Sequence, residues 1–137
     1  MKKWMLLFIL ASLYLFDCSI GEAADWKFVG KSGDGNRSVF IDKESIRPIS
    51  GNLIKAAVKL EYNRGKGVGG FRHKKIVSHA IGDEEFDCRE RRTKTLQVTV
   101  HFTDGDTANG DTISWKFVIP QSILETIYDY VCTNGKK

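Results

Sequence analysis

Two segments of the sequence carry enough positive charge to form a binding site. One is the glycine-rich stretch 64–75, and the other directly follows Cys88. If the fold brings basic groups together, they attract an anionic polymer, an acidic protein surface or lipid head groups. The candidate binding residues for a protein or anionic partner are Arg72, Lys74, Lys75, Arg89, Arg91 and Arg92. The alternative is a solvated loop and a charged sheet edge that resists aggregation.

The overall charge is too mild to indicate a nucleic-acid partner. The formal net charge is +4, and the aromatic side chains that would stack on bases are not interleaved with the basic ones. The glycines of 65–70 also lack the Gly-Lys-Ser/Thr ending of a phosphate-binding loop, and no helix signal follows them. We therefore predict no nucleic-acid partner and attribute these glycines to backbone flexibility.

The acidic and histidine side chains do not follow a metal-binding pattern. In an EF-hand loop beginning at Asp104, the sixth-position glycine would be Asn109 and the twelfth-position glutamate would be Trp115. The histidines lack ligand spacing, and we expect His101 to face solvent on a strand. The sequence therefore predicts no metal and no cofactor, and an acidic hairpin loop over 103–111.

Catalytic motifs are equally hard to find. Nothing in the chain resembles the nucleophile elbow of a hydrolase. A serine–histidine–aspartate site stays open as an alternative, because its members meet only in space. The residues thus favour binding over catalysis, with a small hydrolase as the competing interpretation.

The first 23 residues have the layout of a secretory signal peptide. Two lysines precede an apolar run over 5–16, and small and polar residues follow. That run is shorter than the roughly 20 apolar residues that span a bilayer, which argues against the alternative of an uncleaved anchor. Cleavage after Ala23 places the small residue Gly21 at the −3 position, although cleavage one residue later stays open. We predict a signal peptide over 1–23, a single domain over 24–137, and export to the periplasm or cell surface.

The cysteines fit export. The chain has three, of which Cys18 should leave with the signal peptide. Cys88 and Cys132 then predict one disulfide in an oxidising compartment, the alternative being two free thiols. Lipid attachment at Cys18 is a further alternative, but the acidic Asp17 before it is a poor context, so we do not expect membrane anchoring.

Alternating apolar and polar residues predict β-strands along most of the mature chain. The clearest strand is 52–62, whose inward face comprises Ile54, Ala56, Val58, Leu60 and Tyr62. In 95–102 the expected inward residues are Leu96, Val98, Val100 and Phe102, with Thr95, Gln97, Thr99 and His101 outward. Further strands are expected at 25–30, 37–41 and 84–88, and a last one with Trp115, Phe117 and Ile119 on its apolar face. Segment 42–50, which contains Pro48, is expected to be a connection.

The period changes to that of a helix after Pro120. Ser122 and Glu125 form a capping-box pattern, and apolar residues recur at helical spacing up to Val131. So short a helix is marginal alone and must dock on the sheet. Cys88 shares its parity with Phe86, so its thiol should point to the face on which the helix lies. We predict an α+β, mainly β fold, in which an antiparallel sheet of about six strands carries one C-terminal helix packed on one face, with the helix end tied to the sheet by the disulfide.

Several spaced motifs resemble the surface-adhesin protein E family. They are Trp26 four residues before Gly30, Phe40-Ile41-Asp42 leading to Ser45-Ile46-Arg47, Phe86-Asp87-Cys88 followed by basic residues, and Trp115 to Ser122 leading to Cys132. Together they cover nearly the whole mature chain. The resemblance implies a six-stranded antiparallel sheet with a disulfide-tethered C-terminal helix, export, and no enzymatic activity.

The resemblance also bears on function. The family's name-giving member is a lipoprotein adhesin that binds host matrix and plasma proteins and haem, and it dimerises. Only framework residues carry over to this chain, Cys88 and Cys132 above all, and a homodimer stays open. We therefore predict an exported non-enzymatic binding domain that recognises a protein or anionic partner at the cell envelope or host matrix. The alternative is a periplasmic assembly or stability factor with no adhesin role.

Overall fold

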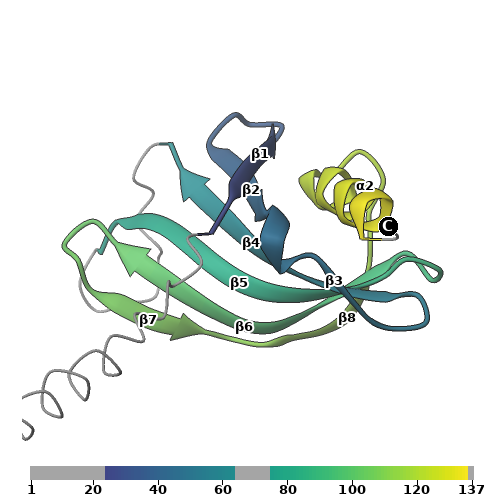
Figure 1. The fold of residues 1–137 in the computed structure, drawn as a ribbon. Helices are drawn as coiled ribbons and strands as arrows, with labels where there is room; N and C mark the ends of the chain where they lie inside the picture. The colour runs from purple at the N-terminus through teal and green to yellow at the C-terminus, as the bar shows by residue number, and fades with distance from the viewer. Residues whose placement is uncertain (1–23, 64–74, 136–137) are drawn as a thin grey trace, which may run out of the picture.

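In the part of the chain that the structure describes, a curved antiparallel sheet carries one α-helix over one of its faces (Figure 1). The computed structural model describes residues 24–63 and 75–135. The elements are β1 (Trp26–Lys31), β2 (Arg37–Asp42), the 3-10 helix η1 (Lys43–Ser45), β3 (Arg47–Ser50), β4 (Leu53–Tyr62), β5 (Val77–Asp87), β6 (Arg92–Phe102), β7 (Thr107–Gly110), β8 (Ile113–Phe117) and α2 (Ile123–Asn134).

The eight strands occupy six positions across the sheet. The order is β1-β2-β4-β5-β6-β7, and two short strands lie off this path. β2 and β3 pair with successive parts of the same edge of β4, and β7 and β8 do the same along β6. The prediction of an antiparallel sheet of about six strands with a C-terminal helix is confirmed.

The face of the sheet beneath α2 forms the hydrophobic core. On β4 the residues Ile54, Ala56 and Val58 are at most 4% exposed, as their alternation predicted. From α2 the buried side chains are those of Ile127, Tyr128, Val131 and Cys132. Gly30 of β1 lies against the helix, where a Cβ atom would make ordinary van der Waals contact with Thr126 at 3.4 Å. Burial of these apolar side chains is what holds a twelve-residue helix in place.

The predicted cap and disulfide are both present. The Ser122 hydroxyl accepts a hydrogen bond from the Glu125 N–H at 3.3 Å. The Glu125 carboxylate reaches back one residue further than a standard capping box, because it accepts from the Gln121 N–H at 2.8 Å. Cys88 and Cys132 are bonded with their Cα atoms 5.7 Å apart, so the disulfide ties the helix end to the sheet as predicted.

A β-bulge corrects the alternation expected in β6. Thr95 is 3% exposed rather than outward, and Leu96 is only partly buried. The reason is a register shift: Glu84 pairs with Thr95, whereas the adjacent Asp83 pairs with Gln97, which leaves Leu96 as the extra residue. Such a bulge reverses the parity of every residue before it.

Three further expectations about strands need correction. The connection 42–50 contains η1 and β3, in which Pro48 is tolerated because β3 lies at a sheet edge. The loop 103–111 is shorter than expected, since it gives way to β7 at Thr107. The apolar residues at the end of β8 are not buried: Phe117 is 74% exposed and Ile119 is 68% exposed.

Gly135, which ends α2, offers a direct test of the core packing. A Cβ atom there would lie 2.7 Å from Cδ1 and 2.8 Å from Cγ2 of the buried Ile54. We expect Gly135→Ala to lower the free energy of unfolding by about 1–3 kcal/mol, the usual cost of overpacking. The matched control is Gly33→Ala in an open turn, where a Cβ atom meets nothing within 4 Å and the change should stay within about 0.5 kcal/mol. Urea unfolding measures both, and equal effects of the two variants would contradict this packing.

Candidate binding surface

The candidate basic residues do not gather at one place. Arg72 and Lys74 lie outside the described residues. Lys75 stands just before β5, whereas Arg89, Arg91 and Arg92 lie at or just after the turn that ends it. β5 has eleven residues, which at about 3.3 Å per residue separate the two groups by about 36 Å of strand.

Lys75 is engaged with the acidic turn between β6 and β7. Its ammonium group forms ion pairs with Asp106 and, at 3.4 Å, with Asp104. It also lies over the Phe102 ring, 5.4 Å from the centroid. The hydrogen bond to Asp106, with that to Asp104, raises the pKa of Lys75. The Asp104–Asp106 loop is therefore a partner of this lysine, and it fastens the start of β5.

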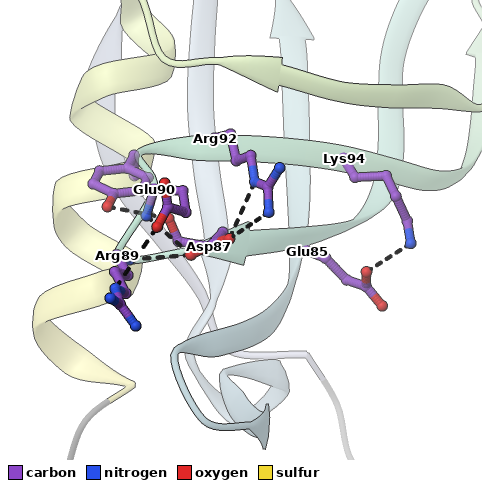
Figure 2. A network of polar contacts seen from close by, with 7 residues as sticks. Glu85, Asp87, Arg89, Glu90, Arg92 and Lys94 are labelled. Atoms are coloured by element: carbon purple, nitrogen blue, oxygen red, sulfur yellow. Dashed lines mark hydrogen bonds and ion pairs between the residues drawn. The ribbon is translucent and has the colours of Figure 1, made fainter.

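Asp87 organises the turn between β5 and β6 (Figure 2). Its Oδ1 accepts hydrogen bonds from the backbone N–H groups of Arg89 at 3.2 Å and Glu90 at 3.0 Å. Its Oδ2 accepts from Nε of Arg92 at 3.1 Å and lies 3.0 Å from Nη2 of the same side chain. Burial raises the pKa of Asp87, but the hydrogen bonds from Glu90, Arg92 and Arg89 outweigh it and hold this pKa below its ordinary value. One carboxylate thus fixes both the turn and the first side chain of β6.

Three contacts fasten this turn to α2. The first is the disulfide at Cys88. The second is a buried hydrogen bond in which the Tyr128 hydroxyl donates to the Asp87 carbonyl at 3.3 Å. The third is Arg91, whose guanidinium pairs with Glu125 at 2.7 Å and lies over the Tyr128 ring. Arg91 adopts a φ of 50°, which is uncommon for a residue with a side chain and aims it toward the helix.

Charges alternate with an aromatic ring across the outer face of β5, β6 and β8. Arg92 pairs with Asp87, and Lys94 pairs with Glu85 at 2.8 Å (Figure 2). The two cations also lie over the Trp115 ring, at 5.0 and 5.3 Å from its centroid. Cation–π contacts of this kind hold the ring and both cations in fixed positions.

Arg89 is the least constrained of the three arginines. Its side chain is 76% exposed and contacts Glu90 at 3.7 Å. It lines an open hollow of about 430 Å³ together with Asn52, Leu53, Asp87, Glu90, Arg92 and Trp115. We call this feature the turn hollow. The Cys88 N–H donates to the Asn52 carbonyl at 3.0 Å, which joins the β3–β4 turn to the β5 end of the hollow.

A buried carboxyl escaped the sequence prediction. Glu84 lies on the helix face of β5 between Ala56 of β4 and Thr95 of β6. Burial raises its pKa, whereas the nearby Lys116 and Thr95 lower it in part. Its Oε2 and the Oγ1 of Thr93 are buried without a hydrogen-bond partner among the described residues. The sequence contained a signal for this burial, because Glu84 has the same parity as Phe86 and so lies on the same face of the strand.

His101 differs from the solvent-facing position expected of it, and His73 lies outside the described residues. His79 and His101 are direct cross-strand neighbours whose rings stack with centroids 4.3 Å apart, so His101 is half-buried rather than solvent-facing. Burial, with His101 and Lys59 nearby, lowers the pKa of His79. Within residues 24–63 and 75–135, no three histidine, cysteine or carboxylate side chains gather in a way that could hold a metal ion.

A comparison with models of protein families shows to which family the chain belongs. The family model for surface-adhesin protein E matches residues 26–133. The chain belongs to the surface-adhesin protein E family. This match confirms the resemblance found in the sequence motifs, and it spans every strand and nearly all of the C-terminal helix of the described structure.

Solved structures support the same family at the level of fold. Crystal form II of Haemophilus influenzae protein E superposes with a TM-score of 0.57 at 14% identity, covering 86% of this chain and 98% of that one. The selenomethionine form of the same protein gives 0.56 at 16% identity, covering 80% and 88%. No curated protein sequence matches this chain. In the described part of the chain, neither η1 nor α2 has the length and apolar character needed to cross a membrane.

Asp87 carries a prediction about acid stability. Since its pKa is lowered by folding, its contribution is present above its unfolded pKa and is lost as the pH falls through its folded pKa. We expect Asp87→Asn to lower the free energy of unfolding at pH 7 by about 2 kcal/mol, because charge-assisted hydrogen bonds are lost. The difference from the parent protein should shrink as the pH falls below about 4.

Urea unfolding between pH 7 and pH 3 measures this effect. Asp111→Asn is the matched control, since it removes the same charge from an exposed position after β7 and should change stability little. A difference between Asp87→Asn and the parent that stays constant over the whole pH range would contradict the assigned role.

Proposed function

We propose that this chain is an exported, non-enzymatic adhesin domain that binds a protein partner at the cell envelope or in the host matrix. Membership of the surface-adhesin protein E family over residues 26–133 is the observation that carries this proposal. The secretory layout of the first 23 residues and the Cys88–Cys132 bond fit an oxidising compartment outside the cytoplasm.

The contact surface we propose lies at the end of the sheet that carries the β5–β6 turn. It consists of Arg89, Arg92, Trp115 and Phe117, and we call it the turn-end surface. Phe117 and Arg92 are cross-strand partners, and Arg92 in turn pairs with Asp87. Exposed aromatic and arginine side chains on a rigid support are typical of the energetically important part of protein interfaces.

The ion pairs favour a protein partner over an anionic polymer. Near the turn, Arg89, Arg91, Arg92 and Lys94 face the carboxylates of Glu90, Glu125, Asp87 and Glu85. A polyanion would have to compete with these four carboxylates, and the attraction left over at long range is small. A protein surface can instead use the exposed ring of Phe117 and the partly exposed indole.

Paired substitutions on opposite edges of the sheet test this assignment. We expect Arg89→Ala with Phe117→Ala to weaken binding to immobilised host-matrix protein at least tenfold, since two interface side chains are truncated. The matched control is Arg47→Ala with Ile49→Ala on β3, which removes the same kinds of exposed side chain from the other edge and should leave affinity unchanged. Surface plasmon resonance measures both.

Substitutions in the glycine-rich segment 64–75 test the competing site. If replacement of Arg72, Lys74 and Lys75 abolishes binding in a salt-dependent way, and the Arg89 and Phe117 pair has no effect, the turn-end surface is not the site. That result would favour the anionic partner considered in the sequence analysis.

Localisation separates the adhesin from the periplasmic assembly factor. We expect a membrane-impermeant amine label to reach the protein on intact cells, and mass analysis to show a chain without residues 1–23 and with one disulfide. Protein that is labelled only after osmotic shock would support the periplasmic alternative. A chain that retains Cys18 with the mass of a lipid would overturn the cleavage site.

A further inference from the structure

The turn hollow combines one aromatic wall with a ring of hydrogen-bonding groups. The indole of Trp115 lines it, and Asn52, Arg89 and Glu90 supply an amide, a guanidinium and a carboxylate. Asn52 is exposed, so a ligand can reach the donors and the acceptor of its side-chain amide. A volume of about 430 Å³ is in the range of small-molecule sites in proteins.

The walls of the hollow are held in place before any ligand arrives. Asp87 fixes the backbone of the turn and the guanidinium of Arg92, which in turn lies over Trp115. The Cys88 N–H holds the Asn52 carbonyl, and the disulfide holds Cys88. Because the turn backbone, Arg92 and the Trp115 ring are already ordered, a ligand loses free energy chiefly in immobilising the exposed side chain of Arg89.

The charges around the hollow limit the chemistry of its ligand. Arg89 and Arg92 contribute two positive charges, and Asp87 and Glu90 contribute two negative ones. A charged ligand would therefore meet a like charge as readily as an opposite one. A wholly apolar ligand would remove these polar groups from water without replacing their hydrogen bonds, which is costly. A neutral ligand rich in hydroxyl groups avoids both penalties.

We propose that the turn hollow binds one neutral pyranose unit of a glycan. The apolar C–H face of the sugar ring packs on the part of the Trp115 indole that lines the hollow, and Arg92 and Lys94 stay over the ring. Its hydroxyl groups accept hydrogen bonds from Arg89 and Asn52 and donate to the carboxylate of Glu90. This inference rests on the proposed function, because it names the chemistry that part of the turn-end surface recognises on its partner.

Indole N–H resonances of the ¹⁵N-labelled exported chain provide the test. The probes are the methyl glycosides of glucose, galactose, mannose and N-acetylglucosamine, each titrated to tens of millimolar. Trp115→Phe identifies the Trp115 resonance by its loss. We expect at least one neutral glycoside to shift that resonance saturably while the Trp26 resonance stays fixed. Asn52→Ala should weaken the binding at least fivefold. Asn63→Ala should not, because this amide follows the other end of β4 and bonds to Ser38 and Gly35.

Other outcomes separate this inference from the proposed function. If no neutral glycoside moves the Trp115 resonance, or only glucuronic acid and sialic acid glycosides do, the neutral-sugar site is wrong. The protein-partner assay with Arg89→Ala and Phe117→Ala is a separate measurement, because it follows the protein partner and because Phe117 does not line the hollow. Conversely, saturable sugar binding with unchanged protein-partner affinity in that double variant supports the sugar site and overturns the turn-end surface. An unchanged pattern of backbone amide resonances shows that each variant is folded.

Discussion

The bond between Cys88 and Cys132 is the constraint on which the rest of the molecule depends. It joins a twelve-residue helix, too short to be stable alone, to the turn that ends the central strand β5. Closing a loop with a sequence separation of 44 restricts the unfolded chain by about 4 kcal/mol in the chain-entropy description. The Tyr128 hydroxyl and Arg91 add non-covalent contacts at the same junction. The helix, the core beneath it and the outer turn are thereby a single structural unit.

The same junction determines which carboxylates pair with the basic residues of the β5–β6 turn. Asp87 is buried next to the disulfide and holds Arg92 in an ion pair. Glu125, placed by the helix cap, holds Arg91 in the same way. A run of basic residues in the sequence therefore becomes a set of ion pairs with an aromatic ring among them. Such a surface is suited to specific contacts with a protein or a sugar, whereas its long-range attraction for polyanions is weak.

Much of the fold could be predicted because its signals are local. The alternation of Ile54, Ala56 and Val58 defines the core face of β4, and Ser122 with Glu125 marks the start of α2. The disulfide followed from the count of cysteines and from the parity that Cys88 shares with Phe86. Each of these features depends on neighbours within a few residues or on composition, which a single sequence contains.

The site could not be predicted to the same extent because it depends on register and on contacts between distant strands. The bulge at Leu96 arises from pairing with β5, and no pattern of residues in β6 predicts it. The position of Trp115 over Arg92 and Lys94 requires β8 to lie beside β6. Likewise, a basic run does not reveal which carboxylates lie across from it. Sequence thus identified Arg89, Arg91 and Arg92, whereas their partners required the structure.

Amide hydrogen exchange in the oxidised and the reduced protein tests the central claim most directly, that the disulfide makes the helix and the β5–β6 turn one unit. The amides to follow are those of Arg89 and Glu90, which donate to Asp87, and that of Val131 in α2. If the account is right, reduction accelerates exchange at all three positions by a similar factor, because the turn and helix open together. Faster exchange at Val131 with no change at Arg89 and Glu90 would contradict it.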